Sequence, residues 1–174
     1  MNKAVFLDRD GVLIKAPISK DKKPLSIKNI SDLKFLPTVI KTCKILKNKF
    51  LLIMITNQPD VSRKKNKKLN VEKINIFIKK KLKLDDVYVC YSKNENSIFK
   101  KPNPGMIIKA AKKHKINLKK SYFVGDRWKD IDAGTKVSCK TVFIDRNYNE
   151  KLNMKPNFKI KKFNEILKFI KFWI

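Results

Sequence analysis

The chain has 174 residues, with 43 lysine and arginine side chains against 15 aspartate and glutamate, a formal net charge of +28 at pH 7. This length fits a single domain, residues 1–174, and a hydrophobic fraction of 43% excludes a disordered chain. Only four of the bases are arginine, so we favour a biased coding background over a polyanionic partner as the origin of the charge.

Short apolar runs predict six β-strands, at residues 4–7, 51–55, 87–90, 122–124, 141–144 and 158–160. Helical spacing of apolar residues predicts helices between and after them, at residues 37–46, 71–82, 104–115, 130–137 and 164–173. Strands that alternate with helices indicate an α/β fold with a doubly wound parallel sheet. The segment 14–34 fits neither period, so we expect a long excursion at the rim of the sheet and no second, cap domain.

Polar clusters follow four of the predicted strands. Asp8 and Asp10 come directly after the first strand, Thr56 follows the second, Lys101 precedes the helix after the third, and Asp126 follows the fourth. Because the carboxyl ends of parallel strands meet at one edge of a sheet, we expect these side chains to converge there. Asp-x-Asp-Gly alone fits a solvated turn equally well, but the other three clusters favour a site.

This set of groups suits phosphoryl transfer through a carboxylate nucleophile. Asp8 can attack phosphorus, and Asp10 can protonate the leaving alkoxide and then activate water. A carboxylate that attacks a phosphate needs cations nearby; Mg²⁺ held by Asp8, Asp126 and the backbone carbonyl of Asp10 would supply one, and Lys101 the other. Thr56 can donate a hydrogen bond to a phosphate oxygen.

The motifs Asp-Arg-Asp-Gly-Val, Thr-Asn-Gln, Lys-Pro-Asn-Pro-Gly-Met and Gly-Asp-Arg-x-x-Asp-Ile resemble those of the haloacid dehalogenase superfamily of phosphohydrolases. The resemblance covers the chain from Asp8 to about Asn149, and it is strongest to the branch of heptose bisphosphate phosphatases and histidinol-phosphatases. It implies a small, nearly capless enzyme with Asp8 as nucleophile. It also implies that Asn57 joins Thr56 in contacting phosphate and that Asp130 supports the metal ligands from behind.

Two departures from the family pattern bear on the site. Relatives often carry a zinc loop before the lysine motif, but residues 90–100 retain one cysteine, Cys90, so we predict no zinc and a loop held by packing of Ile98 and Phe99. Relatives also often have arginine before the motif lysine, where this chain has Lys100. We take Lys100 and Arg63 as candidate substrate-binding residues, and expect specificity to come from segments 14–34, 61–69 and 90–100.

Other conspicuous residues have structural explanations. Cys43 and Cys139 lie in apolar patterns typical of a core, and His114 lies in a lysine-rich stretch typical of a solvated helix face. Trp128 suits either the site or packing. Three spaced cysteines without a Cys-x-x-Cys pair favour a reducing compartment, and no apolar run reaches the roughly 18 residues of a membrane span. We therefore expect a cytoplasmic monomer with no membrane partner.

The sequence thus predicts a Mg²⁺-dependent phosphomonoesterase acting on a small phosphorylated metabolite. A sugar bisphosphate of the heptose type is the substrate that the resemblance favours, with histidinol phosphate as an alternative. A second alternative is a phosphatase of polynucleotide ends, which the basic composition suits but which lacks an aromatic stripe for base stacking. A third is a non-catalytic binding protein, which the intact set of acids and lysine argues against.

Overall fold

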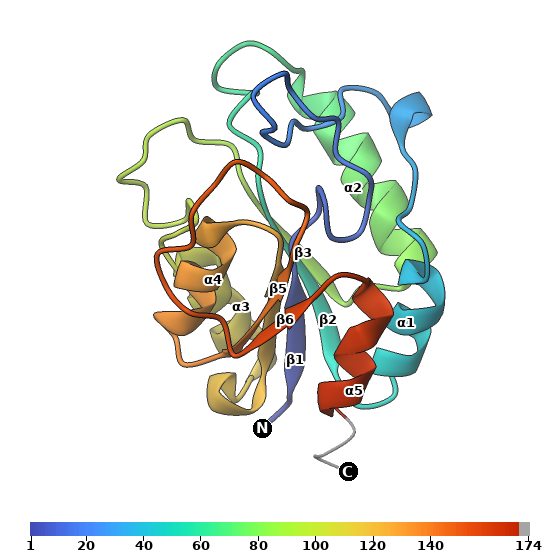
Figure 1. Ribbon diagram of the computed structural model, residues 1–174, viewed down its shortest axis with the longest axis vertical. Coiled ribbons are helices and arrows are strands. Elements are labelled where there is room, and N and C mark those ends of the chain that lie inside the picture. Colours follow the sequence, from blue (N-terminus) through green and yellow to red (C-terminus); the bar gives the residue numbers. More distant parts are fainter. Residues whose placement is uncertain (171–174) are drawn as a thin grey trace.

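A parallel sheet of six strands forms the centre of the protein (Figure 1) in a computed structural model, which describes residues 1–170. The strands are β1 (Ala4–Leu7), β2 (Leu51–Asn57), β3 (Asp86–Cys90), β4 (Tyr122–Gly125), β5 (Lys140–Ile144) and β6 (Phe158–Ile160). Their order in the sheet is β3-β2-β1-β4-β5-β6, and every neighbouring pair is parallel. This confirms the predicted doubly wound α/β fold.

Helices cover both faces of the sheet (Figure 1). One face carries α1 (Val39–Leu46), α2 (Lys68–Leu82) and α5 (Ile166–Ile170), and the other carries α3 (Gly105–His114) and α4 (Trp128–Thr135). Short 3-10 helices lie at Ile30–Asp32, Leu118–Lys120 and Phe163–Glu165. Among the residues that the structure describes, no helix is long and apolar enough to cross a membrane.

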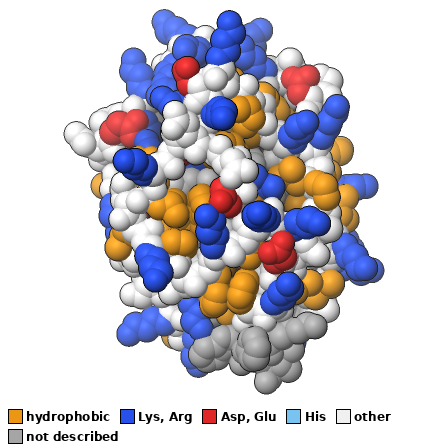
Figure 2. Space-filling model, in the orientation of Figure 1, with side chains coloured by type: hydrophobic (Ala, Val, Ile, Leu, Met, Phe, Trp, Pro, Cys, Tyr) orange, Lys and Arg blue, Asp and Glu red, His pale blue; other side chains and the backbone are white. Residues whose placement is uncertain are grey.

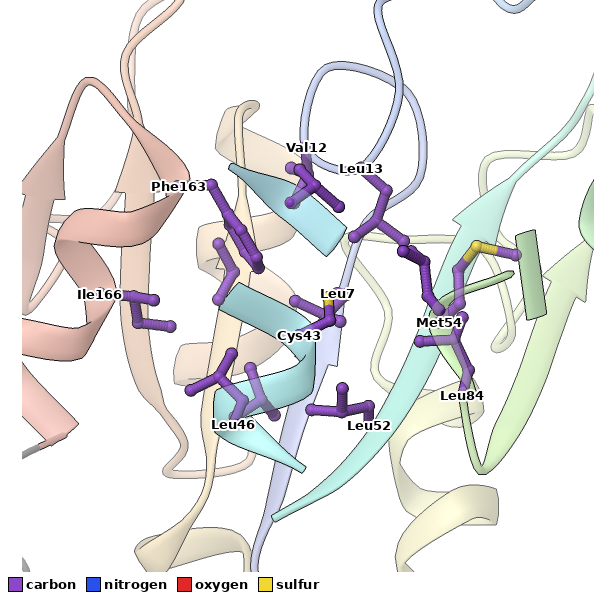
Figure 3. Close-up of a cluster of buried hydrophobic side chains, with 14 of the residues drawn as sticks. Leu7, Val12, Leu13, Cys43, Leu46, Leu52, Met54, Leu84, Phe163 and Ile166 are labelled. Atoms are coloured by element: carbon purple, nitrogen blue, oxygen red, sulfur yellow. The ribbon is translucent and has the colours of Figure 1, made fainter. Parts of the chain in front are cut away.

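The hydrophobic core lies in two layers, one on each face of the sheet. In the first layer the central strands face α1, and the side chains labelled in Figure 3 include Leu7, Leu52, Met54, Cys43 and Leu46. All five are at most 2% exposed. Strands β1 and β2 are buried on both faces, which explains why their central residues are apolar throughout. The burial of Cys43 confirms its prediction as a core residue.

The second layer packs α3 and α4 against the other face of the same strands. Phe6 of β1 stacks on Phe123 of β4 with ring centroids 6.3 Å apart, and Ala110 and Ala133 bring the two helices close to the sheet. Cys139 is also buried in this layer, as predicted. The sheet is therefore buried on both faces. This burial stabilises the strands, and the strands hold in place the loops that follow their carboxyl ends.

Element boundaries differ from the predictions where polar residues belong to regular structure. Strand β2 continues past Ile55 because Thr56 and Asn57 still pair with β3. Helix α4 begins two residues earlier than predicted because the Asp130 carboxylate accepts the Arg127 N–H and so caps the first turn. The helix predicted at 164–173 begins as a 3-10 turn and is helical to Ile170, and the last three residues of that prediction lie outside the described part.

The excursion at 14–34 folds back over the carboxyl edge of the sheet. Its base is closed by a bridge between Ile14 and Phe35, and its tip by a bridge between Ile18 and Pro24. In Figure 1 it lies at the top of the molecule, above the end of β1. The one regular element within the excursion, all of which the structure describes, is the 3-10 helix Ile30–Asp32, which is too short to form a second domain.

Candidate active site

Asp8 and Asp10 lie on a tight turn directly after β1. The Asp8 N–H donates to the carbonyl of Val124 at 3.0 Å, which fixes the turn against β4. Gly11 has a φ of +83°, in the left-handed region, and a Cβ there would overlap the carboxylate of Asp126 and the hydroxyl of Tyr148. Glycine at this position therefore lets the β1 turn approach the end of β4 closely.

Lys101 lies at the centre of the site. Its ammonium donates to Asp8 Oδ1 at 2.7 Å, to Asp130 Oδ1 at 2.6 Å and to the carbonyl of Ile55 at 2.9 Å. Burial alone would lower the pKa of Lys101, but Asp130 and Asp8 raise it above its usual value, so the side chain stays an ammonium. Asn57 clamps the backbone of Lys101: its amide donates to the Lys101 carbonyl at 3.0 Å and accepts the Lys101 N–H at 3.1 Å.

Three buried carboxylates crowd together beside this lysine. Asp8, Asp126 and Asp130 each offer an oxygen within 4.8 Å of the others. Burial, followed by repulsion from Asp8 and Asp130, raises the pKa of Asp126 well above its usual range. Burial also raises the pKa of Asp130, against the opposing effect of Lys101.

The same cluster fits a divalent cation. Asp126 Oδ2 accepts the Tyr148 hydroxyl at 2.8 Å, but Asp126 Oδ1 is buried without a hydrogen-bond partner. An unpartnered carboxylate oxygen next to two further carboxylates is a set of hard oxygen donors of the kind that Mg²⁺ prefers. The residues present therefore suit the predicted Mg²⁺ site.

The Asp10 carboxylate is held by neighbours on three segments. Its Oδ2 accepts from Arg9 Nε at 3.0 Å, from Gln58 Nε2 at 2.9 Å and from Ser26 Oγ at 3.4 Å. Gln58 Nε2 also donates to Thr56 Oγ1 at 2.9 Å. Gln58 thus links the acid of the β1 turn to the hydroxyl at the end of β2.

These groups surround a pocket of about 70 Å³ that opens to solvent. It is lined by Asp8, Asp10, Pro24, Leu25, Ser26, Thr56, Asn57, Lys101, Arg127, Lys129 and Asp130. Most of the residues predicted from sequence are thus brought together at one edge of the sheet. Asp126 joins them through the carboxylate cluster, and Asp130 contacts Lys101 directly instead of lying only behind the metal ligands.

Two predicted substrate-binding residues do not reach the pocket. Arg63 is 44% exposed and pairs with Asp60 at 3.4 Å. The side chain of Lys100 is buried, and its ammonium donates to the Lys93 carbonyl at 2.9 Å and to Glu95 Oε1 at 2.7 Å. The prediction for Lys100 is wrong because a carbonyl and a carboxylate of its own loop already satisfy the buried ammonium.

The predicted packing of the loop at 90–100 is also wrong. Ile98 is 66% exposed and Phe99 is 40% exposed, so neither anchors the loop. Partly buried polar contacts hold it instead. The Lys100 ammonium donates to the Lys93 carbonyl, and the Asn103 amide donates to the Ser97 carbonyl at 3.0 Å. That the loop needs no zinc stays a prediction.

Several residues around the site were not predicted from the sequence. Gln58 and Arg127 belong to the motifs Thr-Asn-Gln and Gly-Asp-Arg-x-x-Asp-Ile, and their place in those motifs was a usable signal. Ser26 and Tyr148 come from irregular segments, where no periodicity marks a functional side chain. Lys129 reaches the pocket from the first turn of α4 and pairs with Glu95 at 3.0 Å.

Two residues without an assigned role have defined surroundings. His114 Nε2 lies 2.8 Å from Asp86 Oδ2 and its side chain is 21% exposed, so it is bonded and only partly solvated, contrary to the prediction. Trp128 is half-buried and lines a second hollow together with Asp126 and Tyr148. It therefore lies beside the carboxylate cluster without lining the pocket itself.

A doubly wound parallel sheet that presents a buried lysine between carboxylates at its carboxyl edge defines the class of haloacid dehalogenase-like phosphatases. Residues 3–162 match the family model described as polynucleotide kinase 3 phosphatase. The chain therefore belongs to this family of the haloacid dehalogenase superfamily.

Curated proteins narrow the relationship. Over 175 residues the chain is 32% identical to the D-glycero-alpha-D-manno-heptose-1,7-bisphosphate 7-phosphatase of Campylobacter jejuni, covering 97% of this chain and 96% of that protein. Over 147 residues it is 33% identical to the D-glycero-beta-D-manno-heptose-1,7-bisphosphate 7-phosphatase of Helicobacter pylori, covering 80% and 81%.

A solved structure agrees in fold. The D,D-heptose 1,7-bisphosphate phosphatase from B. bronchiseptica, complexed with magnesium and phosphate, superimposes with a TM-score of 0.82 at 18% identity. The superposition covers 99% of both chains. The similarity therefore extends over the full architecture, including the segments around the site.

Proposed function

We propose that the protein is a Mg²⁺-dependent phosphomonoesterase in which Asp8 is the nucleophile. The observation that carries this proposal is the contact of Asp8 with the buried Lys101, beside an Asp126 oxygen that has no partner. The arrangement places a nucleophile, a cation and free metal-ligand capacity within one small site. Asp8, Asp126 and the backbone carbonyl of Asp10 would hold Mg²⁺, which would neutralise charge on the nucleophile and the phosphate.

The reaction consists of two displacements at phosphorus. A carboxylate oxygen of Asp8 forms a bond to phosphorus while the bond to the leaving oxygen breaks, and Asp10 gives that oxygen a proton. Water then attacks the aspartyl phosphate, Asp10 takes a proton from the water, and Asp8 is restored as inorganic phosphate leaves. Lys101 and Thr56 bind the transferred phosphoryl oxygens and hold them for in-line attack.

We propose a sugar bisphosphate of the D-glycero-D-manno-heptose 1,7-bisphosphate type as substrate. The names of two curated relatives at 32% and 33% identity support this class. Arg127 and Lys129 line the rim of the pocket, where Arg127 pairs with Glu150 and Lys129 with Glu95. A second phosphate would replace these carboxylates as the partner of the two cations. The anomer is left to experiment, since the two relatives are named for different anomers.

The proposal extends to the oligomeric state, the compartment and the metal requirement of the enzyme. We propose that it acts as a monomer in the cytoplasm and needs Mg²⁺ but no zinc. Three free, buried cysteines suit a reducing compartment. A single cysteine in the loop at 90–100 is too few ligands for a tetrahedral zinc site.

Phosphate release from a panel of metabolites tests the proposal. The panel contains both anomers of heptose 1,7-bisphosphate, the two heptose monophosphates and histidinol phosphate, each with and without Mg²⁺. We expect release from a heptose bisphosphate that requires Mg²⁺ and is abolished in Asp8→Asn. Activity that is indifferent to Mg²⁺, or that survives in Asp8→Asn, would contradict the proposed mechanism.

A polynucleotide end is the second candidate substrate, favoured by the description of the matching family model. An open pocket on a basic molecule would admit a strand end. Binding of short oligonucleotides over a salt series decides this candidate, because each phosphate contact adds to the salt dependence of the affinity. A 3′-phosphorylated oligonucleotide dephosphorylated faster than every sugar phosphate would replace the first candidate by the second.

A further inference from the structure

Arg9 is a charged side chain that the protein buries completely. Its exposed fraction is 0%, and it lies between Asp8 and Asp10 in the sequence. Its Nη1 donates to Asn75 Oδ1 at 2.9 Å, and its Nε donates to Asp10 Oδ2 at 3.0 Å. Asn75 is a buried residue on α2. A continuous chain of contacts therefore runs from helix α2 through the guanidinium to the acid at the pocket.

The two oxygens of Asp10 are held unequally. Oδ2 accepts from Arg9 Nε, from Gln58 Nε2 at 2.9 Å and from Ser26 Oγ at 3.4 Å. Oδ1 has a longer contact, 3.3 Å to Arg9 Nη2. The guanidinium fork fixes the plane of the carboxylate, which a point charge such as lysine does not do. Oδ2 is thus the anchored oxygen.

Stability alone is a weak reason for such a contact. Taking a guanidinium out of water has a desolvation cost of several kcal/mol, and well-packed apolar side chains often replace a buried ion pair without loss of stability. The buried arginine does, however, define one geometry for its partners. The partner here is the carboxylate to which the proposed reaction assigns proton transfer.

We propose that Arg9 is a positioning residue that, braced by Asn75, holds Asp10 with Oδ2 anchored and Oδ1 as the oxygen that carries the proton to the leaving group. The inference rests on the proposed function, because it assigns a supporting residue to the acid of that reaction. It also makes helix α2 part of the catalytic geometry, although the described residues that line the pocket include none from α2.

The test compares two leaving groups. A sugar phosphate leaves as an alkoxide that needs a proton, whereas p-nitrophenyl phosphate leaves as a stable phenolate that does not. The ratio kcat/KM covers the steps up to the first irreversible one, so activation of water by Asp10 does not enter it. For Arg9→Met we expect kcat/KM to fall about 100-fold or more for the sugar phosphate, as for loss of a general acid, and far less for p-nitrophenyl phosphate.

Two further variants complete the design. Asn75→Leu removes the brace without touching Asp10, and we expect the same selectivity with a smaller loss. Glu72→Gln is the control: it lies on the same helix, is 45% exposed and pairs with Lys68 at the surface. We expect this control to match the wild type on both substrates. Melting temperatures identify the variants that are folded.

Equal losses on the two substrates, or no loss on either, in folded Arg9→Met and Asn75→Leu would overturn the inference. If Arg9→Met does not fold, Asn75→Leu decides by the same criterion. Failure of the proposed function gives a different result: the wild type then releases no phosphate from either substrate with Mg²⁺, or Asp8→Asn stays active. That result would remove both proposals.

Discussion

Asp126 is the carboxylate of the cluster whose negative charge is least compensated by its neighbours. One of its oxygens is buried without a partner, and burial, Asp8 and Asp130 all raise its pKa. Its charge therefore destabilises the metal-free protein, and the same charge prepares the site to bind a cation. Function and stability are opposed at this residue.

Asp126→Asn should consequently stabilise the metal-free protein and abolish its response to Mg²⁺. We expect a gain of roughly 1 kcal/mol without metal, which corresponds to about 2–4 °C in Tm for a domain of this size. For the wild type, Mg²⁺ at about 100 times its Kd should add about 2.7 kcal/mol of stability. Thermal melts over a Mg²⁺ series measure both quantities. A variant that keeps the wild-type Mg²⁺ shift would show that Asp126 is not a ligand.

At the scale of elements, the loop at 90–100 is a separate unit held from within by Lys100. Replacing Lys100 by Met removes an ammonium bonded to the Lys93 carbonyl and to Glu95. We expect a loss of about 1.5–3 kcal/mol of stability, typical of hydrogen bonds to charged groups, and faster proteolysis of the loop. KM should change little, because the ammonium does not line the pocket.

Lys93→Met is the matched control for this variant, since the Lys93 side chain is exposed and only its carbonyl takes part. It should leave the melting temperature and the proteolysis rate unchanged. If Lys100→Met instead raised KM at unchanged stability, Lys100 would act on the substrate and the structural explanation would fail.

The start of β3 is tied to the end of α3 through Asp86. Burial raises the pKa of this carboxyl, but hydrogen bonds from Lys113 and His114 outweigh it and hold the pKa well below its usual value. A folded-state pKa below the unfolded one means that the stabilisation is complete above about pH 3.9 and is lost as the pH falls further.

Asp86→Asn should therefore lower Tm at pH 7, by an amount worth at most about 1 kcal/mol because Lys113 is mostly exposed. The difference in Tm between wild type and variant should narrow as the pH is lowered below about 4. Asp21→Asn, at an exposed position of the excursion, is the control. A difference that stays constant down to pH 2 would exclude the ion pair as its cause.

Agreement between sequence and structure was best where function is tied to the end of a strand. Asp8, Asp10 and Asp126 follow a strand by at most a few residues, and Thr56 lies in the last two residues of β2, so predicting the strands also predicted their convergence. The position of a site residue relative to the end of its strand is a local property, so it can be predicted from one sequence.

The remaining parts of the site depend on contacts between distant segments. Ser26 and Tyr148 reach Asp10 and Asp126 only because two irregular loops pack over the same edge. No spacing rule predicts such packing. Lys100 was misplaced for a related reason: adjacency to Lys101 in sequence does not determine direction, and a loop carboxylate draws it away from the pocket.

At the scale of the whole molecule, the net charge of +28 creates a positive field around the protein. Figure 2 shows lysine and arginine side chains spread over the visible face, with few acidic ones among them. Such a field attracts any phosphorylated substrate without distinguishing one from another. Specificity must therefore come from the pocket and its rim.

Salt should weaken this attraction. The screening length falls from about 30 Å at 0.01 M to about 8 Å at 0.15 M ionic strength, so kcat/KM for a bisphosphate should fall over this range. We expect kcat to remain nearly constant, since the groups inside the pocket are close together and partly desolvated. Steady-state kinetics at fixed free Mg²⁺ measure both constants. A kcat/KM that does not respond to salt would mean that the field has no part in substrate capture.

The proposed mechanism depends most on Asp8 as the nucleophile, and trapping of the aspartyl-phosphate intermediate tests this role directly. Enzyme turning over heptose 1,7-bisphosphate with Mg²⁺ is quenched in acid and reduced with borohydride, which converts an aspartyl phosphate to homoserine, and peptides are examined by mass spectrometry. We expect the change at residue 8 alone, dependent on substrate and Mg²⁺, and absent from Asp8→Asn. Turnover without modification of Asp8, or modification at another carboxylate, would contradict the mechanism.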